Sequence, residues 1–441
     1  MTNSVPESVW YNFAADDIAS ASAIREFEAW KAAILQGDRL RALGQFVAQE
    51  MGGGRTATYV ENKSGSYNIV FRFRLDDGKE LALRLPTPRR MVPALVVERL
   101  ENEVSWMQYF EEHAIAKVPH VHSWSVSAAN AIGHPFILMD FVGGEPLYDC
   151  ILSWFRAEDR SQRTPLMTTL YRDLAALYVL SDTPGAATDG WPTGPLDSVS
   201  PYKDFVDLLH HTQQDGLRTI NIPGRVDDLI YEMQQGDAID MERAMKTARG
   251  RVLARHSMQD AASLAFFEEE DDADQDGRPF RIFNPDMSVR NILVDPKTGH
   301  IAALIDFEYT NAMPAALAHS PPLFILPHVL TSYLIEGKFD EFLQNYKIFF
   351  PFFANILEEV EKNTALSTTS VVPLSAKMQT SFKDMSWLVR FAYSHVDMAD
   401  MIYWEQRDLF PLVNEDGLEA ETRAYQEHTK RQIASFRKDT E

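Results

Sequence analysis

The sequence at residues 282–295 (IFNPDMSVRNILVD), followed by residues 303–308 (ALIDFE), decides the fold class of this chain. Asp286 stands five residues before Asn291, and Asp306 follows Asn291 by fifteen residues. Phosphoryl transfer from ATP needs one carboxylate that orients the attacking hydroxyl and accepts its proton. It also needs an amide oxygen and a second carboxylate that hold magnesium. Asp286 fits the first role, and Asn291 and Asp306 fit the metal roles.

The residues between these polar groups predict a hairpin. Residues 292–294 and 301–305 are apolar and strand-like, and residues 295–299 (DPKTG) are typical of a tight turn. Such a hairpin carries Asn291 and Asp306 to neighbouring ends of two paired strands. The alternative interpretation is a surface hairpin whose aspartates only cap its turns.

A second strand pair is predicted upstream. Residues 67–75 (YNIVFRFRL) and 80–86 (ELALRLP) are strand-like, and Asp77-Gly78 between them favours a tight turn. Arg84 on the return strand occupies the place where kinases carry the lysine that pairs with the α- and β-phosphates of ATP.

The loop before this pair contains Gly65, Ser66 and Tyr67. In a strand–turn–strand context, backbone N–H groups after Gly65 can reach ATP phosphates, and we therefore assign these three residues to the nucleotide site. A plain turn is the alternative interpretation.

A helix should supply the partner of Arg84. Apolar residues recur at helical spacing on one face, at Val96, Leu100, Met107 and Phe110. Glu103 falls on the same face, where a carboxylate is costly to bury unless it meets a cation. We therefore expect an ion pair between Glu103 and Arg84, equivalent to the lysine–glutamate pair of kinases. If Glu103 lies at the edge of the face, it reaches solvent instead.

These motifs together resemble the aminoglycoside phosphotransferase and choline kinase-like family, most closely its large fungal branch. The family's landmarks occur in order between about residues 55 and 410: residues 65–68 (GSYN), 83–86 (LRLP), 103–107 (EVSWM), 118–119 (VP), 136–140 (FILMD), Asp286 with Asn291, 305–308 (IDFE) and 320–322 (SPP). Single motifs of this kind are weak signals, whereas eight in one order are a strong signal.

The resemblance implies an α+β, protein kinase-like fold with two lobes and ATP between them. We expect an N-terminal helical extension at residues 1–54, a small nucleotide-binding lobe at 55–143, and a helical lobe at 144–441. Carried over by position, Asp286 matches the catalytic base, Asn291 and Asp306 match the magnesium ligands, and Glu103 matches the helix glutamate.

The hinge between the lobes is expected at residues 143–146 (GGEP). In this fold the main chain of Asp140 and Val142 would contact the adenine edge. Family members build the acceptor pocket from C-terminal helices, and our acceptor-side candidates are Glu308, Asp397, Asp400 and Trp404. An amphipathic helix packed through Trp404 is the alternative interpretation of the last three.

Three positions depart from the family pattern. Asn284-Pro285-Asp286 stands where the family usually has His-Gly-Asp, and the histidine is thought to support the loop. Arg84 replaces the lysine, and a forked guanidinium is not an equivalent phosphate ligand. Glu308 replaces the glycine of the kinase Asp-Phe-Gly motif.

Composition agrees with a globular intracellular protein. The 441 residues are 45% hydrophobic and 11% aromatic, and the single cysteine, Cys150, rules out an internal disulfide. The N-terminal residues lack the pattern of a secretory signal, so we expect a cytoplasmic location. The most apolar region, residues 312–334, is interrupted by prolines, which argues against a membrane span.

The formal charge of −22 bears on the partners of the chain. It argues against nucleic acid and anionic membranes, because both require a basic surface. It is compatible with a cationic or amine-bearing substrate, and solubility alone explains it equally well.

The sequence therefore predicts an ATP- and Mg²⁺-dependent phosphotransferase that acts on the hydroxyl of a small molecule. A pseudokinase or ligand-binding module with the same fold is a second interpretation, since Arg84 and Asn284 depart from the family. A nucleotidyl (adenylyl) transferase is a third. The sequence leaves the identity of the acceptor and the oligomeric state open.

Overall fold

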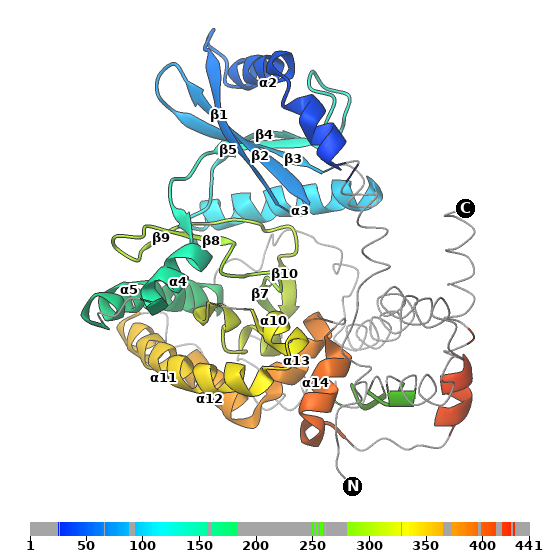
Figure 1. Cartoon of the computed structure of the whole chain (residues 1–441). Coiled ribbons are helices and arrows are strands. Elements are labelled where there is room, and N and C mark those ends of the chain that lie inside the picture. Colours follow the sequence, from blue (N-terminus) through cyan, green and yellow to red (C-terminus); the bar gives the residue numbers. More distant parts are fainter. Residues whose placement is uncertain are drawn as a thin grey trace.

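The computed structural model describes most of the chain between residues 25 and 427 (Figure 1). The described residues are 25–87 except 26 and 66, 93–156, 160–182, short pieces between 249 and 261, 280–364 except 328, 372–411 except 396 and 397, and 417–427 except 425 and 426. Within these ranges, none of the helices combines the length and the apolar character that crossing a bilayer requires.

The small lobe is an antiparallel sheet with the strand order β1-β2-β3-β5-β4. Its strands are β1 (Ala57–Ser64), β2 (Asn68–Leu75), β3 (Glu80–Pro86), β4 (Val121–Ser125) and β5 (Phe136–Asp140). Helices α2 (Gly37–Glu50) and α3 (Pro93–Glu112) accompany the sheet (Figure 1).

Alternation along β3 distributes its side chains between two hydrophobic clusters. Leu81, Leu83 and Leu85 pack in the cluster that contains residues of α2, whereas Ala82 packs in the cluster that contains residues of α3. Since successive strand residues face opposite sides, Arg84 lies on the α3 side with Ala82. The strand period therefore directs Arg84 toward α3.

The predicted pairing of the two upstream strands is confirmed. Strands β2 and β3 pair antiparallel, with Val70 opposite Arg84, and Gly78 in the turn has a φ of 87° that favours glycine. Strand β1 was not predicted from the sequence. Its residues are at best half-buried, so its hydrophobic alternation is weak.

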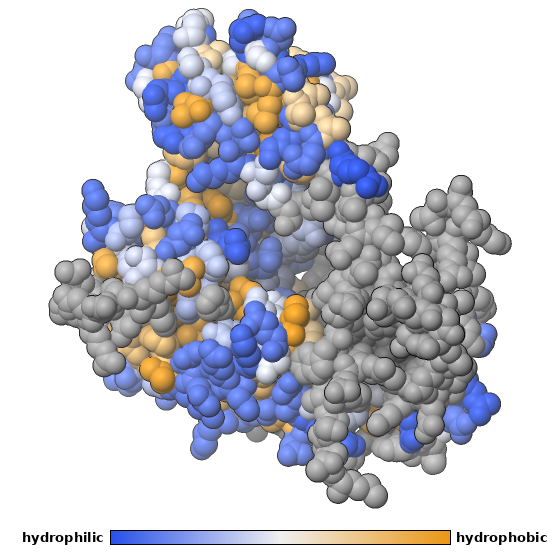
Figure 2. Space-filling model, viewed as in Figure 1, coloured by the Kyte–Doolittle hydropathy of each residue, from blue (hydrophilic) through white to orange (hydrophobic). Residues whose placement is uncertain are grey.

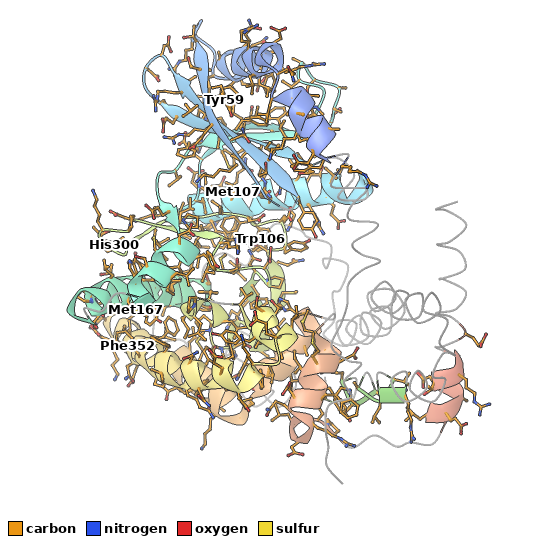
Figure 3. The ribbon with its side chains drawn as sticks, in the orientation of Figure 1. Tyr59, Trp106, Met107, Met167, His300 and Phe352 are labelled. Carbon is orange, nitrogen blue, oxygen red and sulfur yellow. The ribbon has the colours of Figure 1, made fainter. Side chains whose placement is uncertain are left out.

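The second lobe is mainly helical. Its helices are α4 (Leu147–Arg156), α5 (Arg160–Asp182), α9 (Ala315–Ala318), α10 (Leu330–Ile335), α11 (Phe339–Asn363), α12 (Leu374–Asp384), α13 (Ser386–Ser394) and α14 (Ala399–Glu405), with 3₁₀ helices at Leu323–Ile325 and Arg407–Leu409. Helices α5 and α11 pack together, and the rings of Tyr171 and Phe352 lie 5.4 Å apart. Met167 of α5 and Phe352 mark this junction in Figure 3.

Two small sheets accompany the helices of this lobe (Figure 1). Strands β6 (Glu145–Pro146), β8 (Ile292–Val294) and β9 (Ile301–Leu304) form one, and β7 (Phe280–Phe283) pairs with β10 (Asn311–Pro314) in the other. The predicted hairpin is confirmed, because β8 and β9 pair antiparallel with Ile292 opposite Leu304. Gly299 closes the hairpin turn at a φ of 77°, where a Cβ would lie 2.4 Å from the carbonyl oxygen of Leu166.

The α+β, protein kinase-like fold class is confirmed: an antiparallel sheet lobe joins a helical lobe (Figure 1). Trp106 and Met107 of α3 are fully buried at this junction and labelled in Figure 3. The expected helical extension before residue 54 contains α2 and a preceding helix that starts at about residue 25, while residues 1–24 lie outside the described ranges. The domain boundaries near residues 54 and 143 stay predictions.

Candidate active site

The loop between β7 and β8 holds Asp286 and Asn291. The Asn291 side-chain Nδ2 donates to the carbonyl oxygen of Asp286 at 2.9 Å. The backbone N–H of Ile305 donates to the carbonyl of Asn291 at 3.0 Å, which brings the neighbouring Asp306 beside the loop. The structure therefore brings the three predicted residues Asp286, Asn291 and Asp306 together.

Asn284 connects the two aspartates of this site. Its Oδ1 accepts from the backbone N–H of Asp286 at 2.9 Å, and its Nδ2 donates to the carbonyl of Asp306 at 3.1 Å. An amide can perform both tasks because it carries a donor and an acceptor. Although the family's histidine is replaced here, the loop is still tied to the strand end that carries Asp306.

Asp306 follows β9 in a left-handed backbone conformation, with a φ of 68°. Aspartate is among the few residues other than glycine that adopt this conformation readily. Its Oδ1 accepts from Arg84 Nη2 at 2.9 Å, and 29% of its side chain is exposed. The backbone geometry therefore turns this carboxylate toward the small lobe.

Arg84 of β3 lies at the centre of the ion pairs of the site. Its side chain is 8% exposed and pairs with Glu103 of α3 through Nη1, as expected from the sequence. Its Nη2 pairs with Asp306 at 2.9 Å and lies 3.6 Å from Glu308 Oε2. With the Asn68 amide oxygen facing Arg84, that oxygen also accepts from Nε at 3.2 Å. One guanidinium thus links both strands of the upstream hairpin, α3 and the segment after β9.

Three carboxylates surround this guanidinium. Oxygen atoms of Glu103, Asp306 and Glu308 lie within 4.8 Å of one another. Burial raises the pKa of Glu308, with the Asp306 charge adding to the effect and Arg84 opposing it. Arg99 Nη1, 3.6 Å from Glu308 Oε1, is a second cation beside this cluster.

Arg99 and Asn102 are site residues that the sequence reasoning missed. The Arg99 guanidinium lies 5.5 Å from the ring centroid of Tyr67 and 4.5 Å from that of Tyr309. Asn102 Nδ2 donates to the carbonyls of Glu308 and Thr310 at 3.1 and 2.9 Å. Arg99 precedes Glu103 by one helical turn, and this i, i+4 spacing could have identified it.

The carboxyl group of Asp286 has a perturbed pKa. Although the residue is exposed at a cleft, the surrounding protein partly desolvates it, and the charge of Asp306 adds to the effect. The two effects raise the pKa to about 6, against an opposing contribution from Arg99. A carboxyl group with a pKa near 6 is well matched to accept a proton at neutral pH.

The loop between β1 and β2 provides fewer backbone donors than expected. The N–H of Gly65 donates to the carbonyl of Asn68 at 2.8 Å, so it is not available to a phosphate. Ser66 lies outside the described residues. Tyr67 is 40% exposed with its ring near Arg99, which leaves it as the described residue of this loop that faces the cleft.

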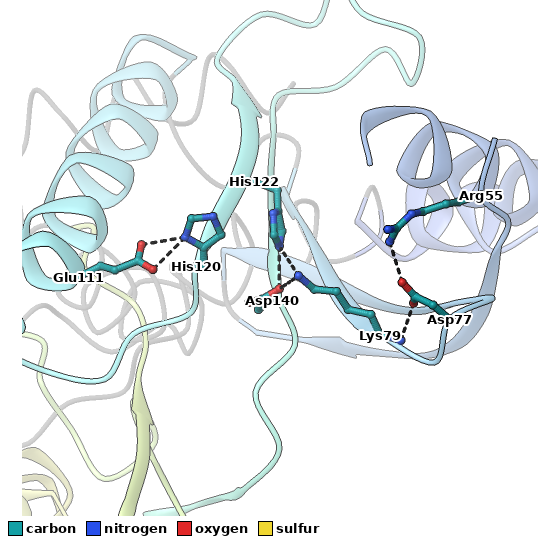
Figure 4. Close-up of polar contacts among 7 residues, drawn as sticks. All are labelled: Arg55, Asp77, Lys79, Glu111, His120, His122 and Asp140. Carbon is teal, nitrogen blue, oxygen red and sulfur yellow. Dashed lines mark hydrogen bonds and ion pairs between the residues drawn. The ribbon is translucent and has the colours of Figure 1, made fainter. Parts of the chain in front are cut away.

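The hinge candidates Asp140 and Val142 lie at and beyond the end of β5. The Asp140 carboxylate pairs with Lys79 at 2.9 Å and with His122 at 2.7 Å (Figure 4). Its N–H donates to the carbonyl of His120 at 2.9 Å. The N–H of Asp140 is therefore not available to adenine, while its carbonyl and Val142 stay candidates.

A cavity of about 440 Å³ adjoins Asp286 on the side of the helical lobe. The face in Figure 2 is hollowed where the two lobes meet. The described acceptor-side candidates do not line this cavity. Glu308 faces Arg84 instead, Asp400 is 1% exposed within α14, and neither these two nor Trp404 lines the cavity. Asp397 lies outside the described residues.

Fold and site together define a protein of the kinase-like phosphotransferase class. The model of the "Phosphotransferase enzyme family" matches residues 58–317, which is more than half of the chain. The chain belongs to this family. The resemblance inferred from the sequence motifs is thereby confirmed.

Fungal proteins named "Altered inheritance of mitochondria protein 9, mitochondrial" are among its relatives. The protein of Lachancea thermotolerans is 22% identical over 309 residues, covering 58% of this chain and 48% of the relative. That of Meyerozyma guilliermondii is 22% identical over 316 residues, covering 62% and 51%. The chain spans about half the length of these relatives. Their names contradict the expectation of a cytoplasmic location.

Solved structures that match this chain include an aminoglycoside-3'-phosphotransferase of type VIII. It is 16% identical, with a TM-score of 0.36, and the match covers 77% of this chain and 97% of that one. An ethanolamine kinase of Plasmodium vivax is 12% identical, with a TM-score of 0.44, over 86% and 81% of the two chains. These similarities are too distant to assign an acceptor.

Proposed function

We propose that this protein is an ATP- and Mg²⁺-dependent phosphotransferase that moves the γ-phosphate of ATP to the hydroxyl of a small molecule. The observation that carries the proposal is the bonded set Asp286, Asn291 and Asp306, held by Asn284. Membership of the phosphotransferase family supports the reaction class.

Asp286 is the proposed base. The acceptor hydroxyl would donate its hydrogen bond to the carboxylate, and its oxygen would form the new bond to the γ-phosphorus. As the bond from phosphorus to the bridging oxygen breaks, that electron pair leaves with ADP, and the hydroxyl proton passes to Asp286. A carboxyl pKa of about 6 suits this task, because the group is ionised at neutral pH.

Asn291 and Asp306 are the proposed magnesium ligands. Since Asn291 Nδ2 already donates to the Asp286 carbonyl, its Oδ1 is the atom left for a cation, and Asp306 adds a carboxylate. Such hard oxygen donors suit Mg²⁺. Magnesium, when bound, would supply positive charge to the phosphates.

Arg84, Glu103 and the loop residues Ser66 and Tyr67, which follow Gly65, are proposed to form the phosphate side of the site. Glu103 holds the guanidinium by an ion pair in which both side chains are nearly inaccessible to solvent. The Asp140 carbonyl and the main chain of Val142 are proposed to contact adenine.

A transfer assay with ATP labelled in either the α- or the γ-phosphate tests this function against its alternatives. With Mg²⁺ and a panel of hydroxyl compounds, we expect label in an organic product only from the γ-position. Label from the α-position would indicate an adenylyl transferase. Binding of Mg²⁺–ATP with no transfer from either position would indicate a pseudokinase.

The names of the fungal relatives lead us to propose a mitochondrial location for this chain. Fractionation of cells that express the C-terminally tagged chain tests it. Co-sedimentation with mitochondrial markers is expected, and recovery in the cytosolic fraction would contradict it.

A further inference from the structure

The cavity beside Asp286 shows which acceptors the proposed reaction can use. Its wall includes the loop that carries Asp286, Leu177 of α5, Phe324 of the 3₁₀ helix at Leu323–Ile325, and Trp387 of α13. Asp286 itself lies in the wall. Because a volume of about 440 Å³ is typical of small-molecule sites, a bound acceptor can place its hydroxyl at Asp286 while the rest fills the cavity.

The wall of this cavity is mostly aliphatic and aromatic. Among its described residues, Asp286 is the only carboxylate and Arg390 is the only lysine or arginine. Arg390 is 5% exposed, and its Nη1 donates to Ser381 Oγ at 3.1 Å. The described part of the wall therefore carries one carboxylate, one buried arginine that donates a hydrogen bond to Ser381, and the imidazole of His395.

Such a wall is unfavourable for a cationic acceptor. Burying an ammonium group without a paired carboxylate is costly, and Asp286 is already assigned to the hydroxyl proton. Of the other candidate carboxylates, Glu308 and Asp400 lie elsewhere, and Asp397 lies outside the described residues. Aromatic rings can bind a quaternary ammonium through their faces, but the described part of the wall offers a bound cation no carboxylate other than Asp286.

We propose that the acceptor is a neutral, largely apolar alcohol or phenol whose apolar part occupies this cavity. The inference rests on the proposed function and specifies its substrate class. The alcohol oxygen forms the bond to the γ-phosphorus, the bridging oxygen leaves with ADP, and the proton moves to Asp286. The products are a neutral apolar group bearing a phosphate ester, and ADP.

Two probes of nearly equal shape test this class. Choline and 3,3-dimethylbutan-1-ol differ in that a quaternary nitrogen in one is a carbon in the other. With the full chain, Mg²⁺ and ATP, we expect kcat/KM for the neutral alcohol to exceed that for choline by about tenfold or more. 2-Phenylethanol, which is neutral and aromatic, is expected to rank with 3,3-dimethylbutan-1-ol.

A charge placed at the cavity rim provides a matched variant pair. Val329 lines the cavity and is 40% exposed, so Val329→Glu is expected to fold. It should raise KM for the neutral alcohol about three- to tenfold and shift the preference toward choline. Ile348→Glu is the control, because Ile348 is 66% exposed and does not line the cavity. Ile348→Glu should leave the KM for the neutral alcohol and the preference between the two probes unchanged. Thermal melts establish that both variants are folded.

Binding is measured separately by ligand-observed NMR with each probe and Asp286→Asn, which removes the base. Selective binding of the neutral alcohols without transfer by the wild type would overturn the proposed function and support the cavity assignment. Transfer to choline in preference to its neutral counterpart would overturn the substrate class and leave the function intact. Absence of both binding and transfer would overturn both.

Discussion

Arg84 and Asp306 are 222 positions apart in the sequence, and their side chains form an ion pair with an N–O distance of 2.9 Å. This pair connects the sheet of the small lobe to the proposed metal ligand of the helical lobe. Because the same guanidinium also pairs with Glu103, α3 is held in the arrangement that a kinase-like site requires.

The forked guanidinium group of Arg84 predicts that Arg84→Lys lowers activity. A lysine ammonium is a single point charge and cannot reproduce contacts to Glu103, Asp306 and Asn68 from separate nitrogens. We expect kcat/KM to fall about 10- to 100-fold, since each lost bond to a charged group is worth about 1.5–3 kcal/mol. Steady-state kinetics measure the loss in kcat/KM, and thermal unfolding measures the effect of the substitution on stability.

Arg74→Lys is the matched control for this change. Arg74 lies in the same sheet and pairs with Glu80 at 2.8 Å, but its side chain is 55% exposed. Exposed pairs contribute little, so turnover should not change. A higher turnover of Arg84→Lys than of the wild type would show that the natural arginine is a loss of function.

The bridging role of Asn284 predicts that Asn284→Ala lowers kcat more than it lowers ATP affinity. The substitution removes the bonds to the Asp286 N–H and the Asp306 carbonyl, so the base loses its fixed position. We expect a loss of about 10- to 100-fold in kcat. Rapid-quench kinetics and calorimetric ATP titration separate the two quantities.

Asn130→Ala is the control, because Asn130 also donates to backbone carbonyls, of Ser127 and His134, but lies in the β4–β5 loop. Equal losses in the two asparagine variants would contradict a specific role of Asn284.

The raised pKa of Asp286 predicts the pH dependence of the reaction. The base must be ionised, so log kcat/KM should be flat above pH 7 and fall with decreasing pH through an apparent pKa of about 6. The ionised form is disfavoured in the folded state, so the free energy of unfolding of the metal-free protein should decrease as the pH rises from 4 to 6. A rate profile that stays flat down to pH 5 would exclude Asp286 as the base.

Cys150 should be unreactive in the folded protein. Burial, reinforced by the charge of Glu145, raises the pKa of its thiol to about 12, so only about one thiol in ten thousand is ionised at pH 8. With a chromogenic disulfide reagent at pH 8, we expect no reaction until guanidinium unfolds the chain. Rapid stoichiometric reaction of the native protein would show that the α4 region opens readily.

The sequence could predict the parts of the site that depend on local periodicity. The hairpin from β8 to β9, the pairing of β2 with β3 and the Arg84–Glu103 contact all follow from two- or 3.6-residue patterns over short windows. Strand β1 escaped prediction because its half-buried residues lack a clear alternation.

Contacts that depend on tertiary packing could not be predicted in this way. The acceptor candidates Asp400 and Trp404 were chosen because they lie in the C-terminal helices, but a place in a helix does not show which cavity that helix faces. Asn102 binds carbonyls more than 200 residues away, and the Arg84–Asp306 ion pair forms only when the lobes meet.

Single-turnover transfer from ATP labelled at the γ-phosphate, compared between wild type and Asp286→Asn, tests the central claim most directly. With Mg²⁺ and 3,3-dimethylbutan-1-ol, the wild type should form labelled phosphate ester, and Asp286→Asn should form it about 10²- to 10⁴-fold more slowly with unchanged ATP affinity. Equal rates for the two proteins would contradict the assignment of Asp286. Wild-type protein that binds Mg²⁺–ATP and transfers label to no hydroxyl compound would contradict the proposed phosphotransferase activity itself.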